Sequence, residues 1–113
     1  MFAIRPTNRF YKINRYVGIR SDTNLPYLVY EGNSDFPGSI HDFGTLEAAK
    51  LYLKKIVEHI DIDVTELSTS QMVDLALVNN ANKFDIIEYT IVDNKLCITA
   101  THPQPQYNRK DWY

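Results

Sequence analysis

One stretch near the C-terminus constrains the fold more than any other, namely "FDIIEYTIVDNKLCITAT" at residues 84–101. Apolar and polar side chains alternate on both sides of Asp93–Asn94, and these two residue types favour a two-residue turn. A hairpin closed there makes every facing pair on one side apolar: Ile91–Leu96, Tyr89–Ile98 and Ile87–Ala100. Because a slip of one residue would mix the two faces, the pattern predicts this register, with the hairpin ending near Thr101.

A helix is predicted directly after Thr45, whose hydroxyl can cap the first turn. Apolar residues then recur at spacings of three and four: Leu46, Ala49, Leu53, Ile56, Val57 and Ile60. This spacing forms one apolar stripe along a helix. We expect the stripe to pack on the apolar face of the hairpin, which carries Ile87, Tyr89, Ile91, Leu96 and Ile98.

A second helix is predicted to begin after Ser68. Gln71 lies three residues further on, so the two side chains can form a capping box, with Leu67 and Met72 placed for a hydrophobic staple. The helix should continue to about Val78, before the asparagine-rich "NNAN". Asparagine tolerates the left-handed conformation that ends many helices.

The N-terminal third reads as a second hairpin. Residues 10–19 and 26–31 are rich in aromatic and β-branched side chains, and the turn residues of 21–25 separate them. A five-residue loop would pair Ile19 with Tyr27, Val17 with Val29 and Arg15 with Glu31. "SIHDF", residues 39–43, is predicted as a short third strand.

Together these elements predict an α+β fold, in which one antiparallel sheet carries two helices on one face. We expect a single domain over residues 1–102 and an extended, proline-containing tail over residues 103–113. The tail ends in aromatic residues, Tyr107, Trp112 and Tyr113, that would be costly to leave in water. It is therefore expected to fold back near Tyr16 and Tyr30, or onto a second copy of the chain in a homodimer.

The composition limits the class of protein. The 113 residues include one cysteine, Cys97, so no internal disulfide can form. No apolar run approaches the roughly 18 residues of a spanning helix, and the N-terminus lacks the apolar segment of a secretory signal. We therefore expect a cytoplasmic protein without a membrane partner.

Specific catalytic patterns are missing from the sequence. His41, His59 and His102 have no metal-binding spacing, and the four glycines form no phosphate-binding loop. Cys97 has no flanking catalytic motif and is expected to be a packing residue on a strand. The sequence thus predicts no catalytic residue, no metal and no cofactor, and favours a protein that is not an enzyme, although catalytic residues from distant segments would leave no local motif.

Charge is unevenly distributed, which suggests two interaction surfaces. Residues 1–20 contain five basic residues and no acid. In the predicted register, a basic-aromatic face of Lys12, Tyr16, Arg20 and Tyr30 could stack unpaired bases and neutralise phosphates. The alternative is that these aromatics pack inward while the cationic ends reach water.

The second surface is a candidate acidic face formed by Asp61, Asp63, Glu66 and Asp74. It could dock on the basic groove of a nucleic-acid enzyme, because opposed charges speed association. A cation site is less favoured, since the glycine of an EF-hand loop is missing. The remaining alternatives are a solvated linker between the two helices, and an earlier start of the second helix in which Asp63 is the cap, with Glu66.

The segment "HDFGTLEAAKLYLKKI" at residues 41–56 is an element common in small domains. Small domains of this kind, without catalytic motifs, are similar in style to accessory proteins of phages and mobile elements, including inhibitors of host defence. The resemblance assigns no site residue. The sequence therefore predicts a binding protein that acts through protein–protein contact as an inhibitor or regulator, and the alternative is a small nucleic-acid-binding module.

Overall fold

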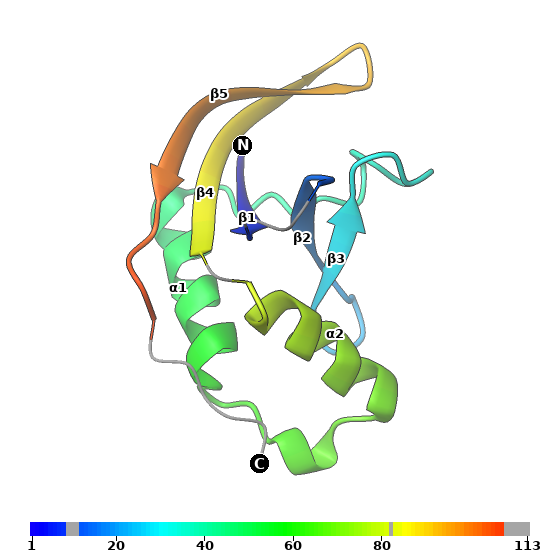
Figure 1. Ribbon diagram of the computed structural model, residues 1–113, viewed down its shortest axis with the longest axis vertical. Coiled ribbons are helices and arrows are strands. Elements are labelled where there is room, and N and C mark those ends of the chain that lie inside the picture. Colours follow the sequence, from blue (N-terminus) through cyan, green and yellow to red (C-terminus); the bar gives the residue numbers. More distant parts are fainter. Residues whose placement is uncertain (9–11, 82, 108–113) are drawn as a thin grey trace.

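Strands and helices follow one another in separate blocks, which gives the α+β fold that the sequence predicts (Figure 1). The computed structural model describes residues 1–8, 12–81 and 83–107. Its elements are β1 (Phe2–Thr7), β2 (Arg15–Ile19), β3 (Pro26–Tyr30), α1 (Leu46–Glu58), a 3₁₀ turn η1 (Val64–Glu66), α2 (Thr69–Asn79), β4 (Lys83–Val92) and β5 (Lys95–Pro103).

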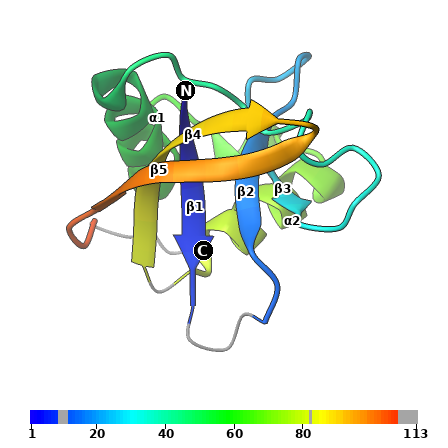
Figure 2. The same ribbon diagram turned by 90° about the horizontal axis from the view of Figure 1, so that it is seen from above.

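The strands form two antiparallel sheets rather than the single sheet expected. One has the order β1-β4-β5 and the other consists of β2 and β3. The difference arises from β1, which was not predicted and which pairs with β4 from Phe2–Glu88 to Thr7–Lys83. Because β1 occupies that edge of β4, the first hairpin packs beside β1 as a sheet of its own (Figure 2).

The predicted third strand at residues 39–43 is not a strand, but it does bind both sheets. The backbone N–H of His41 donates to the carbonyl of Val17 in β2 at 3.1 Å, and that of Phe43 donates to the carbonyl of Phe2 in β1 at 2.9 Å. Alternate residues of one short segment thus bond to different sheets, so neither side forms a ladder. This segment joins the two sheets where they do not pair with each other.

The C-terminal hairpin turns at Asp93–Asn94, as predicted, and Ile91–Leu96 and Tyr89–Ile98 are facing pairs. The predicted Ile87–Ala100 pair is wrong. A bulge between Glu88 and Tyr89 shifts the register, so that Ile87 faces Thr101. A bulge inserts one unpaired residue and bends the strand, and here β5 continues to Pro103, past the predicted end.

The register predicted for the first hairpin is also wrong, by one residue. Val17 faces Leu28 and Arg15 faces Tyr30, because the loop has six residues, 20–25, rather than five. Within it, the N–H of Arg20 donates to the carbonyl of Leu25, and Asn24 adopts a positive φ of 58°. A shift of one residue moves each side chain of one strand to the other face relative to its partner.

Both helices contribute to one hydrophobic cluster on the same side of the strands. Four stripe residues of α1 are buried there, Ala49, Leu53, Ile56 and Val57, together with Leu75 and Val78 of α2. Ile60 is 42 % exposed and lies beyond the end of α1. The stripe packs with Ile4, Phe84 and Ile86 rather than with the predicted face.

The predicted face, which carries Ile87 and Tyr89, belongs to a second cluster on the other side. Ile87 and Tyr89 are buried with Ala3, Tyr16, Val29 and Ile40. The loop between β3 and α1 supplies Ile40 and the half-buried Phe36 to this cluster. The start of β4 is therefore covered on both faces, by helices on one and by this loop and the smaller sheet on the other.

The ends of the helices follow the sequence closely. Thr45 caps α1 by accepting from the N–H of Ala48, and Ser68 and Gln71 form the capping box of α2. Asn79 is a buried polar residue whose amide donates to the carbonyl of Ile56 at 3.0 Å. Because the last carbonyls of a helix have no partner within it, this bond completes the end of α1 and ties α2 to it.

The tail beyond β5 folds back onto the domain, where Tyr107 packs against the same cluster as Tyr30 but not against the cluster of Tyr16. Tyr107 packs against the helix-side cluster and lines a pocket with Val57 and Phe84. Burial, with the charge of Glu58 as a smaller cause, raises the pKa of Tyr107. The predicted contact with Tyr16 is not made by Tyr107, because Tyr16 lies in the other cluster; Trp112 and Tyr113 fall outside the described residues.

Candidate functional site

The basic-aromatic face predicted from the sequence is not assembled. Tyr16 is 1 % exposed in the second cluster, whereas Tyr30 lies on the opposite face of the small sheet, against the helix-side cluster. The guanidinium of Arg15 sits over the ring of Tyr30, 4.9 Å from its centroid. The corrected register explains the separation, since Tyr16 faces Val29 and Tyr30 faces Arg15.

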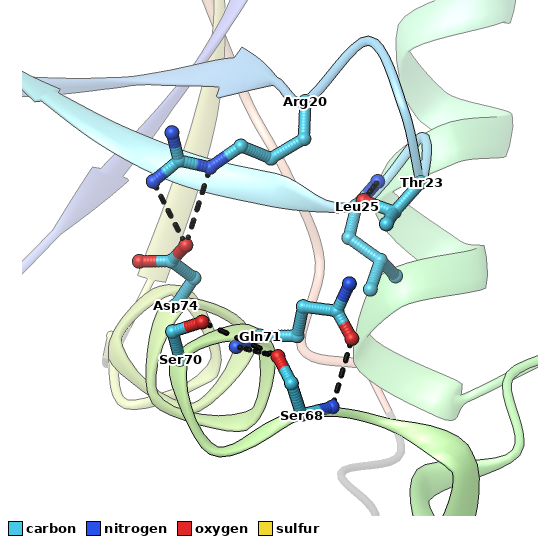
Figure 3. Close-up of polar contacts among 7 residues, drawn as sticks. All are labelled: Arg20, Thr23, Leu25, Ser68, Ser70, Gln71 and Asp74. Carbon is cyan, nitrogen blue, oxygen red and sulfur yellow. Dashed lines mark hydrogen bonds and ion pairs between the residues drawn. The ribbon is translucent and has the colours of Figure 1, made fainter.

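The cationic members of that face have separate surroundings. Arg20 forms an ion pair with Asp74 of α2 at 3.0 Å (Figure 3), and its guanidinium lies 4.2 Å from the centroid of the Tyr27 ring. Lys12 is exposed. Because Tyr16 is buried and Tyr30 lies on the opposite face of the small sheet, the four predicted residues do not form one continuous surface.

Three of the four predicted acidic residues do come together. Asp61, Asp63 and Glu66 line one groove after α1, together with Lys55. Asp63 caps the separate turn η1 rather than an earlier start of α2, and it accepts from the N–H and the hydroxyl of Thr65 at 3.0 and 2.6 Å. These bonds lower the pKa of Asp63. Asp74 does not line this groove and instead forms an ion pair with Arg20.

A larger groove, which the sequence did not reveal, adjoins the acidic one. Its volume is about 760 Å³, and apolar side chains form most of it, including Phe43, Leu51, Tyr52 and Ile60. Leu51 is 75 % exposed, the highest value among the exposed large hydrophobic residues described. Leu51 lies outside the apolar stripe of α1, on the helix face where polar residues are expected. This apolar residue on the polar face was the one sign of the groove in the sequence.

Aromatic contacts form the floor of this groove. Phe43 lies between His41 and Tyr52, with ring centroids 4.6 and 5.2 Å apart. The hydroxyl of Tyr52 donates to the carbonyl of Asn24 at 2.9 Å, and burial raises the pKa of Tyr52. The floor is thus fixed by packing and by one hydrogen bond, whereas Leu51 stands free at the rim.

The two grooves meet at Asn24, Lys55 and Asp61, which line both. We call them the apolar arm (Phe43, Leu51, Tyr52 and Ile60) and the acidic arm (Asp61, Asp63 and Glu66) of the α1 groove. Within the described ranges, no group of three or more His, Cys, Asp or Glu residues could hold a metal ion. The arms can therefore offer apolar contact and negative charge side by side.

Comparison of the chain with models of protein families, with curated proteins and with solved structures found no match. Among the described residues, neither helix has the length and apolar character needed to cross a bilayer. The α1 groove is consequently interpreted from its own geometry and chemistry.

Proposed function

We propose that this protein is a non-enzymatic binding protein that holds a segment of another protein in the α1 groove. The observation that carries the proposal is the exposure of Leu51, 75 %, at the rim of an apolar cavity of about 760 Å³. Contiguous exposed apolar surface in a soluble domain commonly marks an interaction site. No serine, threonine or cysteine is among the residues that line this cavity.

The acidic arm defines the chemistry expected of the partner. A segment with an apolar side chain for the apolar arm and basic side chains beside it would complement both. Basic segments of this kind line the grooves of nucleic-acid enzymes. We therefore propose that this protein acts in the cytoplasm as an inhibitor or regulator of such an enzyme. We further propose that the protein itself is of phage or mobile-element origin. Lys54 lies beside the apolar arm, where it would favour an acidic residue in the bound segment.

A matched pair of leucine substitutions tests the site. Partners captured from a host lysate are identified, purified and titrated against the wild type, Leu51→Asp and Leu77→Asp. Leu77 is also an exposed helical leucine, 43 % exposed, but it lies on α2. Leu51→Asp should weaken binding at least tenfold, the effect expected for an anchor residue, while Leu77→Asp should leave it unchanged.

Charge reversal tests the acidic arm separately. Glu66→Lys should weaken binding of the same partner, and raising the salt concentration should reduce the difference from the wild type. A partner that binds Leu51→Asp as tightly as the wild type would contradict the proposal. Salt-sensitive binding of single-stranded oligonucleotides, unchanged by Leu51→Asp, would favour the nucleic-acid alternative instead.

A further inference from the structure

The outer part of the β4–β5 hairpin lacks the support that the rest of its sheet has. β1 pairs with β4 only as far as Glu88, and the carbonyl of Met1 accepts from the N–H of Tyr89. Beyond that point, from Thr90 to Cys97, β4 and β5 are the only described strands of the sheet. Figure 1 shows this part projecting from the body, and a two-stranded hairpin alone is marginally stable in water.

Apolar side chains are exposed on this projecting part. Ile91 and Ile98 are each 40 % exposed, and Val92 is 55 % exposed. Leu96 is half-buried and, with Ile98, lines a pocket that faces Tyr16 and Phe36. The projecting part thus has an apolar face that its own chain covers only partly.

β5 also has an open edge. Its one partner among the described strands is β4, so every second residue directs its backbone N–H and C=O toward the empty side. Natural edge strands are protected by lysine, proline or bulges, and Lys95 and Pro103 stand at the two ends of β5. Between them, the bulge leaves Thr99 unpaired, and "LCI" at residues 96–98 carries no charged side chain, so this part of the edge is open to another strand.

We infer that β5 pairs with β5 of a second copy of the chain, antiparallel about a two-fold axis at Cys97. Symmetry then places Leu96 opposite Ile98 of the second copy, and Ile98 opposite Leu96 of the second copy. The four side chains lie on one face, because successive residues of a strand alternate between faces. Facing apolar pairs of this kind stabilise antiparallel sheets.

The position of Lys95 and the size of the joined sheet are both compatible with this pairing. Lys95 falls opposite Thr99 of the second copy, so the one lysine of β5 does not oppose its counterpart. The joined sheets would have six strands, in which each projecting hairpin gains a third strand. The pairing uses none of the residues that line the α1 groove, so it can fail without affecting the proposed function.

The oligomeric state of the full chain is the first test. Light scattering should show a dimer, and Ile98→Glu should raise its dissociation constant about tenfold or more, because symmetry repeats the substitution twice. Val92→Glu, on the same hairpin but off the shared edge, is the matched control and should remain dimeric. Unfolding curves of both variants establish that they fold.

The register has its own test. The double variant Leu96→Lys/Ile98→Glu places a lysine opposite a glutamate twice, and should restore the dimer that Ile98→Glu loses. Mild oxidation should link the wild type through Cys97, which is free and exposed, since facing residues of an antiparallel pair are close enough for a disulfide. Moving the thiol two positions, by Cys97→Ser/Thr99→Cys, should slow the cross-linking at least tenfold.

A monomeric wild type would overturn the inference. So would a dimer that survives Ile98→Glu, or one that the α2 substitution Val73→Asp dissociates instead, since Val73 is 51 % exposed on a different element. Equal cross-linking rates for the two thiol positions would contradict the register.

Discussion

The two halves of β4 have the same kind of sequence and very different surroundings. From Asp85 to Glu88 the strand pairs with both β1 and β5, and Phe84, Ile86, Ile87 and Tyr89 are buried in this half. From Thr90 to Val92 it has one neighbour, and both Ile91 and Val92 are exposed. Alternating apolar residues therefore specify the strand and its register, while the covering of each face depends on elements distant in sequence.

The largest effect that separates the two halves should come from one substitution made in each. Ile86→Ala removes a fully buried side chain, 0 % exposed, and should lower the free energy of unfolding by about 2–5 kcal/mol. Ile91→Ala, five residues further on, should lower it by less than about 1 kcal/mol, since less burial is lost. Denaturant titration of both variants checks the difference, and equal losses would mean that the hairpin end is buried in solution.

A close contact that supports the covered half should give the next largest effect. A Cβ added at Gly18 would lie 2.7 Å from the ring of Tyr27 and 2.9 Å from the backbone oxygen of Ser39. Gly18→Ala should therefore destabilise the protein by about 1–3 kcal/mol, through displacement of the small sheet or of the loop that covers it. Thermal unfolding measures the loss. The double variant Gly18→Ala/Tyr27→Ala tests the cause, because removing the ring should relieve part of the cost.

Tyr89 marks the boundary between the halves, and its titration can report on it. Burial, with the charge of Asp42 as a smaller cause, raises the pKa of Tyr89 to about 12 from an ordinary 10.0. The unfolded chain then loses this proton first, so stability should fall as the pH rises from about 10 to about 12. Tyr89→Phe should remove that part of the alkaline loss and the matching tyrosinate absorbance. If Tyr89→Phe showed the same loss of stability between about pH 10 and pH 12 as the wild type, Tyr89 would be as exposed to solvent as the outer half of β4.

The smallest effect is expected at the projecting end itself. Val92→Thr keeps a β-branched side chain at a position that is 55 % exposed, so stability should change by no more than about 0.5 kcal/mol. Equilibrium unfolding is the measurement. A loss comparable to that of Ile86→Ala would contradict the exposure of this end.

The elements that sequence predicted well are those whose signals are local. The Asp93–Asn94 turn fixes the pairs Ile91–Leu96 and Tyr89–Ile98, and Ser68 with Gln71 defines the start of α2. The bulge beside Tyr89 could not be predicted, because an alternating pattern contains no mark for one extra residue. The register predicted for the first hairpin was wrong for a similar reason. A loop of five residues and a loop of six residues differ only in whether Arg20 belongs to the strand or to the turn.

The candidate site was less accessible to sequence than the fold. Asp61, Asp63 and Glu66 are close in the chain, so their grouping was predicted, whereas Asp74 was grouped with them although it is paired with Arg20. The apolar arm combines residues from the loop before α1, from α1 and from beyond it. Such a surface follows only from packing, although Leu51 on a polar helix face was a visible sign of it.

The pairing of β1 with β4 also has a consequence for synthesis. Met1 and Tyr89, which exchange backbone hydrogen bonds, are separated by 88 positions, whereas β4 and β5 are joined by a two-residue turn. During synthesis β1 leaves the ribosome long before its partner β4 has been made. Until then, Ala3 and Ile4 are either exposed to water or bound by a chaperone. Contacts between distant residues also form slowly. We therefore expect the β4–β5 hairpin to form early in folding and β1 to join the sheet last. Nascent chains that are arrested before β4 should then be the form most sensitive to proteases.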